Sequence, residues 1–208
     1  MNLQATDPHP WISAVAMDDR RVSKMTLETA QLYCTATGLG DYKPTHTTHP
    51  LVTWSANNIS WLIRFHHALA GEHFHRTGNV HKSFIDVGQH MIEPPIREPV
   101  AFRNHARSPH MSREPGTLLE PGELSVPIDF TDVADTHKAY RHYLRARWFM
   151  DSKPATWTNR QPPDWLCEPP LRSLPMVIRD TEIARVGENT WRCIIWDGLN
   201  PAQREHLK

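Results

Sequence analysis

Hydrophobic and polar positions follow a helical spacing from Asp18 onward and separate into two neighbouring stripes. The first stripe is the apolar seam of an amphipathic helix, with steps of three and four, and it contains Val22, Met25, Thr29, Leu32 and Ala36. The second stripe has the same spacing but lies beside the seam, and it contains Arg21, Lys24, Glu28 and Gln31. A carboxylate between two cations at the edge of a core is typical of an active-site helix. An ion-pair ladder on a surface helix has the same pattern, so both interpretations stay open.

The same periodicity predicts three main helices. The first runs over about 10–37, either as one helix or as a pair broken near Asp18, and the second over about 50–77. A glycine follows each of these two segments, as expected at a helix end. A third helix is predicted over roughly 133–150, with Ala139, Tyr143, Ala146 and Phe149 facing inward. We therefore expect an all-α fold, a compact bundle of about three main helices.

The eighteen prolines must lie in the connections between these helices. They make regular structure improbable over 79–134, apart from short turns. Weak alternation near the C-terminus predicts a small hairpin, followed by a short helix that starts near Asn200. We divide the chain into a helical catalytic-like domain, 1–170, with a proline-rich insertion at about 86–132, and a small C-terminal extension, 171–208.

The charge balance limits the functions that the chain can have. The sequence has 23 basic and 23 acidic residues, so its formal net charge is zero. Such a chain has no general attraction to polyanions, and any nucleic-acid site must be a local patch. The basic run 136–147 is more typical of a solvated helix face than of a phosphate-binding track, and it contains Lys138, Arg141, His142, Arg145 and Arg147.

Cysteine and apolar patterns bear on the cellular compartment. The three cysteines are far apart and form no CxxC pair, which argues against a disulfide framework or a cysteine zinc site. No signal-peptide pattern or membrane-length apolar run is visible. We therefore expect a soluble, cytoplasmic protein with no membrane partner.

Most of the fourteen histidines lie in the first half of the chain, so a metal site was considered. His46 and His49 have a plausible ligand spacing, and Glu72 and His75 form one Glu-x-x-His pair. A carboxylate-bridged di-iron centre needs two such pairs and two further glutamates. A zinc site needs three or four converging ligands, and no HExxH pattern is present. We predict no metal and no cofactor.

Two short segments combine a cation, an imidazole and a hydroxyl. They are Lys43-Pro44-Thr45-His46 and His81-Lys82-Ser83. This combination suits phosphate binding or general acid–base chemistry. The same residues also fit ordinary polar loops, so the segments are candidates only.

An ordered series of residues along the first half of the chain resembles the pyrimidine-dimer DNA glycosylase family of the phage endonuclease type, with its phage and bacterial relatives. The resemblance covers about 5–85 well and 136–166 loosely. The residues that carry it are Asp19, Arg20, Lys24, Glu28, Gln31, His49-Pro50, Trp54, Trp61, Glu72, Arg76-x-Gly78, Tyr42 to His46, Gly78 to Ser83 and Ala139 to Tyr143.

The resemblance implies an all-α enzyme that acts on a base in DNA, with a bacterium or a phage-infected cell as its host. In characterised members an N-terminal amine attacks the sugar C1′, and a glutamate of the first helix stabilises the imine. The resemblance assigns that glutamate to Glu28. Since Met1-Asn2 offers no N-terminal threonine, Lys24 is the candidate nucleophile, partly desolvated beside Arg21.

Chemistry on a duplex base requires the base to be flipped out, so aromatic and cationic groups are expected near the carboxylate. The predicted catalytic residues are Glu28, Lys24 and Arg21. The predicted nucleic-acid-binding residues are Arg20, Gln31, Lys43, His46, His49, Trp54, His81 and Lys82. An aromatic residue in a helix seam is usually core, so Trp61 is assigned a structural role.

Three functions compete. The first is a DNA base-excision enzyme, a glycosylase or glycosylase/lyase of the pyrimidine-dimer type. The second is an enzyme of phage nucleotide or modified-base metabolism, for which net neutrality is more natural. The third is a non-catalytic protein that binds nucleic acid or a host protein on the same scaffold.

Overall fold

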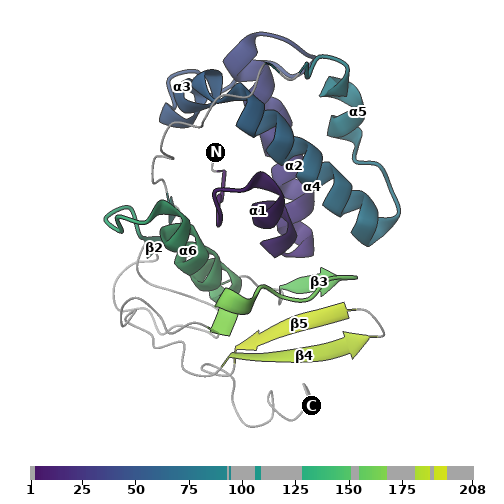
Figure 1. The fold of residues 1–208 in the computed structure, drawn as a ribbon, viewed down its shortest axis with the longest axis vertical. Coiled ribbons are helices and arrows are strands. Elements are labelled where there is room, and N and C mark those ends of the chain that lie inside the picture. The colour runs from purple at the N-terminus through teal and green to yellow at the C-terminus, as the bar shows by residue number, and fades with distance from the viewer. Residues whose placement is uncertain are drawn as a thin grey trace.

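A computed structural model describes residues 3–92, 94, 106–108, 128–150, 155–167, 181–187 and 190–195. Five helices, α1 to α5, form the larger part of the described molecule, and α6 lies beside them (Figure 1). A small three-stranded sheet follows next to the end of α6. The predicted all-α class is confirmed for the bulk of the described chain, with small sheets added at its edge.

The predicted break near Asp18 is confirmed. Helix α1 spans Pro10–Ala16 and α2 spans Asp19–Thr37. Between them, Met17 and Asp18 have extended backbone with ψ angles of 148° and 163°. Gly38 ends α2 in the left-handed conformation, with φ of 74°, and its N–H donates to the Cys34 carbonyl.

The second predicted helix is in fact two helices, α3 (Pro50–Asn57) and α4 (Ile59–Thr77). Asn58 separates them with φ of −128°. Its side-chain Nδ2 donates to the Trp54 carbonyl at 2.7 Å. An asparagine side chain that bonds to the local backbone in this way competes with helix continuation. Gly78 then ends α4 as predicted.

Helix α5, Lys82–Gly88, corrects the prediction of irregular structure over 79–134. The His81 side chain accepts a hydrogen bond from the Ser83 N–H and so caps this short helix. A two-residue pair also forms between β1 (Arg107–Ser108) and β2 (Ile128–Asp129). Most of the predicted proline-rich insertion lies outside the described residues.

Helix α6, Thr136–Met150, confirms the third predicted helix. Ala139, Tyr143 and Ala146 are buried as predicted, whereas the Phe149 side chain lies outside the described residues. The expectation of a solvated basic face was wrong for His142 and Arg145, which are buried. Burial, and then the charge of Arg145, lower the pKa of His142 to about 4.

The predicted C-terminal hairpin is confirmed as β4 (Thr181–Gly187) paired with β5 (Thr190–Ile195). Strand β5 also pairs antiparallel with β3, Thr156–Thr158, so the strand order is β3-β5-β4. A 3₁₀ turn at Asp164–Cys167 follows β3. The predicted final helix near Asn200 lies outside the described residues, and the division of the chain at 170 stays a prediction.

The core forms where α2 packs against α4, with α1 on α4 and with α3 and α5 on α2. The predicted seam of α2 is buried here at Val22, Met25, Thr29 and Leu32. In the first turns of α2, Arg20, Lys24 and Leu27 stay exposed. Among the described helices, none combines the length and the hydropathy that a membrane crossing requires.

Candidate functional site

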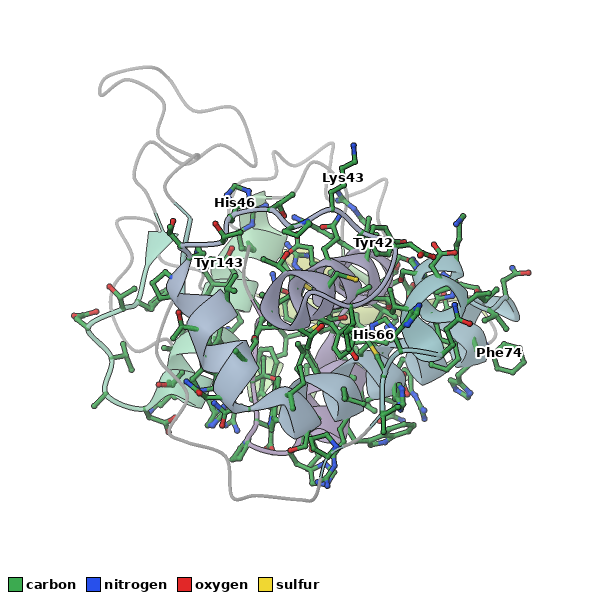
Figure 2. The ribbon with its side chains drawn as sticks, turned by 90° about the horizontal axis from the view of Figure 1, so that it is seen from above. Tyr42, Lys43, His46, His66, Phe74 and Tyr143 are labelled. Atoms are coloured by element: carbon green, nitrogen blue, oxygen red, sulfur yellow. The ribbon has the colours of Figure 1, made fainter. Side chains whose placement is uncertain are left out.

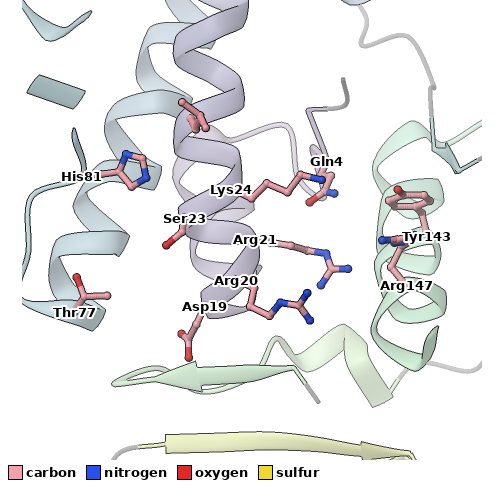
Figure 3. Close-up of a pocket in the computed structure, with 11 residues that line it drawn as sticks. Gln4, Asp19, Arg20, Arg21, Ser23, Lys24, Thr77, His81, Tyr143 and Arg147 are labelled. Carbon is pink, nitrogen blue, oxygen red and sulfur yellow. The ribbon is translucent and has the colours of Figure 1, made fainter. Parts of the chain in front are cut away.

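A pocket of about 710 Å³ lies along the first turns of α2 (Figure 3). Its volume is in the range of small-molecule sites in proteins. Side chains from α2, α6, the N-terminal segment and the α4–α5 region line it, and they are Gln4, Asp19, Arg20, Arg21, Ser23, Lys24, Leu27, Thr77, His81, Tyr143 and Arg147.

The two sides of α2 present different chemistry to this pocket. On the α6 side, the long side chains of Arg20, Arg21 and Lys24 extend toward Tyr143 and Arg147 (Figure 3). On the other side, Ser23 faces His81, with Thr77 nearby (Figure 3). The α6 side is therefore strongly basic, and the α5 side carries hydroxyls and an imidazole.

The N-terminal segment bridges the pocket from α6 toward α2. His137 Nδ1 is hydrogen-bonded to the Ala5 carbonyl at 2.9 Å, and Arg141 Nε donates to the Thr6 carbonyl at 3.0 Å. These bonds place Gln4 at the pocket wall, where its backbone has a left-handed φ of 46°.

Asp18 ties α2 to α6 at the opposite end of the pocket. Its buried carboxylate accepts from Arg21 Nη1 at 2.9 Å and from the indole Nε1 of Trp148 at 2.7 Å. Because the carboxylate is used in this way, it makes no side-chain cap bond to the start of α2. Hydrogen bonds to charged groups are stronger than neutral ones, so this contact helps to fix the spacing of α2 and α6.

Asp19, the first residue of α2, attaches the helix to β3. It accepts from the Thr156 hydroxyl at 2.7 Å, from the Thr158 hydroxyl at 3.0 Å and from the Thr158 N–H at 3.0 Å. Arg76 Nη1 also donates to it at 3.1 Å. Asp19 lines the pocket, but its carboxylate is already bound by donors from β3 and α4, so we assign it a structural role.

Glu72 is fully buried on α4 and holds two arginines. Arg76 Nε and Nη2 donate to it at 3.2 Å, and Arg160 donates through Nε at 3.0 Å and Nη2 at 2.6 Å. The Glu72 hydrogen bond raises the pKa of the Arg160 guanidinium. Arg76 also donates to the Met17 and Val15 carbonyls at 2.7 and 3.0 Å. We call Asp18, Asp19, Glu72, Arg76 and Arg160 the anchor network.

The three predicted catalytic residues occupy different environments. Arg21 is buried and bound to Asp18, whereas the Lys24 side chain is 65% exposed. Lys24 Nζ lies 3.4 Å from Glu28 Oε1, and the Glu28 side chain is 23% exposed. The partial desolvation expected for Lys24 is therefore not found. Lys24 and Arg21 line the pocket, and Glu28 reaches it through its ion pair with Lys24.

Two of the predicted nucleic-acid-binding residues, Arg20 and His81, line the pocket. The structure does not bring the others to it. Lys43 and His46 lie exposed on the loop before α3, and Figure 2 shows both at one edge of the molecule. His49 caps α3 by accepting from the Leu51 N–H at 3.2 Å. The remaining three are Gln31, Trp54 and Lys82.

Each of these three residues lies away from the pocket. Gln31 is half-buried farther along α2. Trp54 is buried edge-on against Trp61 at 5.5 Å, so it belongs to the core, and Trp61 donates to the Pro8 carbonyl at 2.9 Å. Lys82 Nζ is bound to Asp86 at 2.7 Å on the surface of α5.

The first candidate loop is fastened to the second through Tyr42. Its hydroxyl donates to Asp86 at 3.0 Å, and Asp86 also binds Lys82. Burial, and then this hydrogen bond, raise the pKa of Tyr42 to about 12. The loop that carries Lys43 is thus held against α5 rather than over the pocket.

Sequence reasoning missed several pocket residues, chiefly Tyr143 and Arg147 on α6. Tyr143 follows the apolar spacing of its helix, and Arg147 ends the basic run, so each has a simpler interpretation by itself. The other residues that were missed are Gln4, Ser23, Leu27 and Thr77. Only a placement of α6 beside α2 could have identified Tyr143 and Arg147.

Within the part of the chain that the structure describes, no group of three or more His, Cys, Asp or Glu residues lies close enough to hold a metal ion. The reactive groups at the pocket are the amine of Lys24, the His81 imidazole and the arginines, with the Glu28 carboxylate beside Lys24. A nucleophilic amine next to a carboxylate can carry covalent catalysis at a sugar carbon.

Residues 1–86 match the family model of the pyrimidine dimer DNA glycosylases. No curated protein and no solved structure matches the chain. The matched segment ends within α5 and does not reach α6. It includes α2, His81 and the two residues of the anchor network that lie on α4, Glu72 and Arg76. The resemblance to the pyrimidine dimer DNA glycosylase family is thereby confirmed over residues 1–86, and it supports a glycosylase-type function in general.

Proposed function

We propose that this protein is a DNA base-excision enzyme of the pyrimidine-dimer type, a glycosylase/lyase whose substrate nucleotide binds the pocket along α2. One observation carries the proposal: the cationic residues of the family-matched helix and one arginine of α6 line the same pocket. They are Arg20, Arg21, Lys24 and Arg147. Because the whole chain is formally neutral, a local concentration of cations is what a DNA site requires.

The cations divide the task of binding. Arg20 is exposed and can contact a phosphate next to a flipped nucleotide, whereas Lys24, which is also exposed, is left to react at the sugar. Arg147 adds a charge from α6, and Tyr143 beside it presents an aromatic ring. Base-flipping enzymes use such rings and cations to hold the extruded nucleotide.

The chemistry proposed for Lys24 balances with the groups present. Its neutral amine forms a bond to C1′ while the glycosidic C1′–N bond breaks and the base departs with the electron pair. Glu28, 3.4 Å from Lys24 Nζ, takes a proton from the new ammonium group. The same proton then reaches the sugar O4′ as the ring opens, and this leaves a protonated imine between Lys24 and C1′.

The test is covalent trapping. The protein is incubated with ultraviolet-irradiated or undamaged duplex DNA in the presence of borohydride, and adducts are located by mass spectrometry. We expect a reduced adduct at Lys24 with irradiated DNA only. Lys24→Met should abolish it, and Glu28→Gln should slow its formation by about 10²-fold, which is the usual scale for loss of a general acid–base.

The matched control is Lys138→Met, because Lys138 is an exposed lysine of α6 that does not line the pocket. This variant should form the adduct at the wild-type rate. An adduct at residues 1–3 would move the nucleophile to the N-terminal segment beside Gln4 and retain the glycosylase. Absence of both excision and adduct from wild-type protein would reject the proposed function.

A second candidate is an enzyme on a free nucleotide, and the zero net charge favours it. A pocket of about 710 Å³ can hold a mononucleotide. Salt dependence separates the two functions: polynucleotide binding should weaken steeply with added salt if several phosphates are contacted. Tight mononucleotide binding with a shallow salt dependence would favour the second function.

A further inference from the structure

His81 occupies a defined position on the less basic side of the pocket. Its ring lines the pocket and faces Ser23 of α2 (Figure 3). Ser23 and Thr77 contribute hydroxyls on this side, whereas the arginines and Lys24 point toward α6 (Figure 3). The nearest lysine in sequence, Lys82, is bound to Asp86 at 2.7 Å. The groups that His81 accompanies in the pocket are therefore mainly uncharged donors.

One nitrogen of His81 is occupied by the protein itself. Nδ1 accepts from the Ser83 N–H at 3.3 Å and lies 2.8 Å from the Ser83 hydroxyl. A backbone N–H can only donate, so Nδ1 is the acceptor and the proton of the neutral ring is on Nε2. None of the described residues accepts a hydrogen bond from Nε2.

Contacts with two residues, Ser83 and His73, hold the ring in place. The Ser83 hydroxyl, which is buried, donates its single proton to Nδ1 at 2.8 Å, and its oxygen lies 3.2 Å from the Thr26 carbonyl of α2. The His73 ring of α4 packs edge-on against His81, with centroids 4.8 Å apart. The start of α5 is thus fixed to both neighbouring helices, and the Nε2–H has a set position relative to Ser23.

The ring is also kept neutral. Burial, and then the neighbouring His73, lower the pKa of His81, while Asp86 acts in the opposite direction. A neutral N–H donor suits an uncharged acceptor such as a carbonyl oxygen, since phosphates are better held by the cations across α2.

We propose that His81 is a base-recognition residue of this pocket, whose Nε2–H donates a hydrogen bond to a carbonyl oxygen of the bound base. This inference rests on the proposed function, because it requires a DNA nucleotide in the pocket. It goes further by dividing the pocket: the α6 side holds phosphates, and the α5 side reads the base.

Two substitutions separate recognition from helix capping. His81→Asn places an acceptor where Nδ1 lies and keeps the cap, since asparagine is among the best N-cap residues, but it removes the donor at the Nε2 position. His81→Gln keeps a donor near the Nε2 position and loses the cap. The two variants therefore serve as controls for each other.

The experiment measures binding by fluorescence anisotropy to two duplexes. One contains a cyclobutane pyrimidine dimer, and the other contains a tetrahydrofuran abasic analogue at the same position. We expect His81→Asn to weaken binding to the dimer duplex by about 10-fold, the scale of one lost hydrogen bond in a built site. Its affinity for the abasic duplex and the salt dependence should equal those of wild type.

His81→Gln should retain most of the preference for the dimer but unfold at lower urea concentration than His81→Asn. An equal loss on both duplexes for His81→Asn would show a phosphate contact and overturn the proposal. An unchanged dimer affinity for His81→Asn would overturn it as well. Wild-type protein that binds neither duplex would instead reject the proposed function on which it rests.

Discussion

Helix α2 carries two carboxylate–cation groups about two turns apart, and they differ in nearly every physical respect. The anchor network at its start joins Asp18 and Asp19 to donors from α4, α6 and β3, mostly away from water. The Lys24–Glu28 pair is an i,i+4 contact whose lysine is 65% exposed. The first group defines where α2 lies, whereas the second is free to change partners. Carboxylate–cation contacts therefore have two uses on the same helix. In the anchor network they hold the fold together, and at Lys24 and Glu28 they are available for catalysis.

The largest effect is expected when the centre of the anchor network is removed. Glu72→Ala leaves Arg76 buried without its main counter-charge and also releases Arg160. Breaking a buried ion pair on one side costs about 3–5 kcal/mol of the free energy of unfolding. Urea unfolding followed by tryptophan fluorescence measures it. A loss below about 1 kcal/mol would show that the network is not a structural requirement.

Asp18→Asn should have a smaller effect. The amide keeps an acceptor for Trp148 but loses the charge that holds Arg21. We expect a loss of about 2 kcal/mol in the free energy of unfolding, typical of a charge-assisted bond between buried groups. The same urea experiment measures it, with His75→Gln as an exposed control on α4. Equal stability of both variants would contradict the assigned role of Asp18.

A buried histidine makes the stability of the protein depend on pH. Burial lowers the pKa of His66 to about 3, and its Nδ1 is hydrogen-bonded to Thr29 at 2.9 Å. Between about pH 6.5 and 3, His66 is therefore protonated in the unfolded chain but not in the folded protein. The free energy of unfolding falls as the pH falls through this window. From pH 7 to 5.5 we expect His66 to account for about 1 kcal/mol of the loss.

His66→Gln should remove that part of the pH dependence. The measurement compares the free energy of unfolding of wild type and variant at the two pH values. The variant can be less stable overall, but its loss between pH 7 and 5.5 should be smaller. A loss equal to that of wild type would assign the acid sensitivity to other groups.

The smallest effect on stability is expected at the exposed pair. Lys24→Met should change the free energy of unfolding by less than about 0.5 kcal/mol, as is usual for surface ion pairs. The same variant should lose the trapped adduct entirely. This contrast would separate the Lys24–Glu28 pair from the anchor network most sharply. A marked loss of stability in Lys24→Met would show instead that Lys24 has a structural role.

The sequence predicted the parts of the fold that depend on local pattern. The apolar seam from Val22 to Leu32, the break near Asp18 and the stop at Gly78 each follow from spacing or from a single residue type. The break at Asn58 and helix α5 were missed because each depends on one side chain bonding to nearby backbone. Periodicity carries no sign of such bonds.

The site was predicted less well than the fold, for a physical reason. Lys24, Arg20 and His81 were selected by their own chemistry, and all three line the pocket. Tyr143 and Arg147 come from a helix far along the chain, and only tertiary packing brings them there. Trp54 was selected for its ring, but its place in the core depends on the neighbouring Trp61.

The anchor network also joins segments that are made at very different times during synthesis. Trp148 follows Asp18 by 130 residues, Thr158 follows Asp19 by 139, and Arg160 follows Glu72 by 88. Within the family-matched segment these carboxylates have Arg21 and Arg76 as cationic partners, and further donors come from residues that are made later. A chain cut short before β3 would keep the residues that line the pocket but would lose the contacts of Thr158 and Arg160 that attach Asp19 and Glu72.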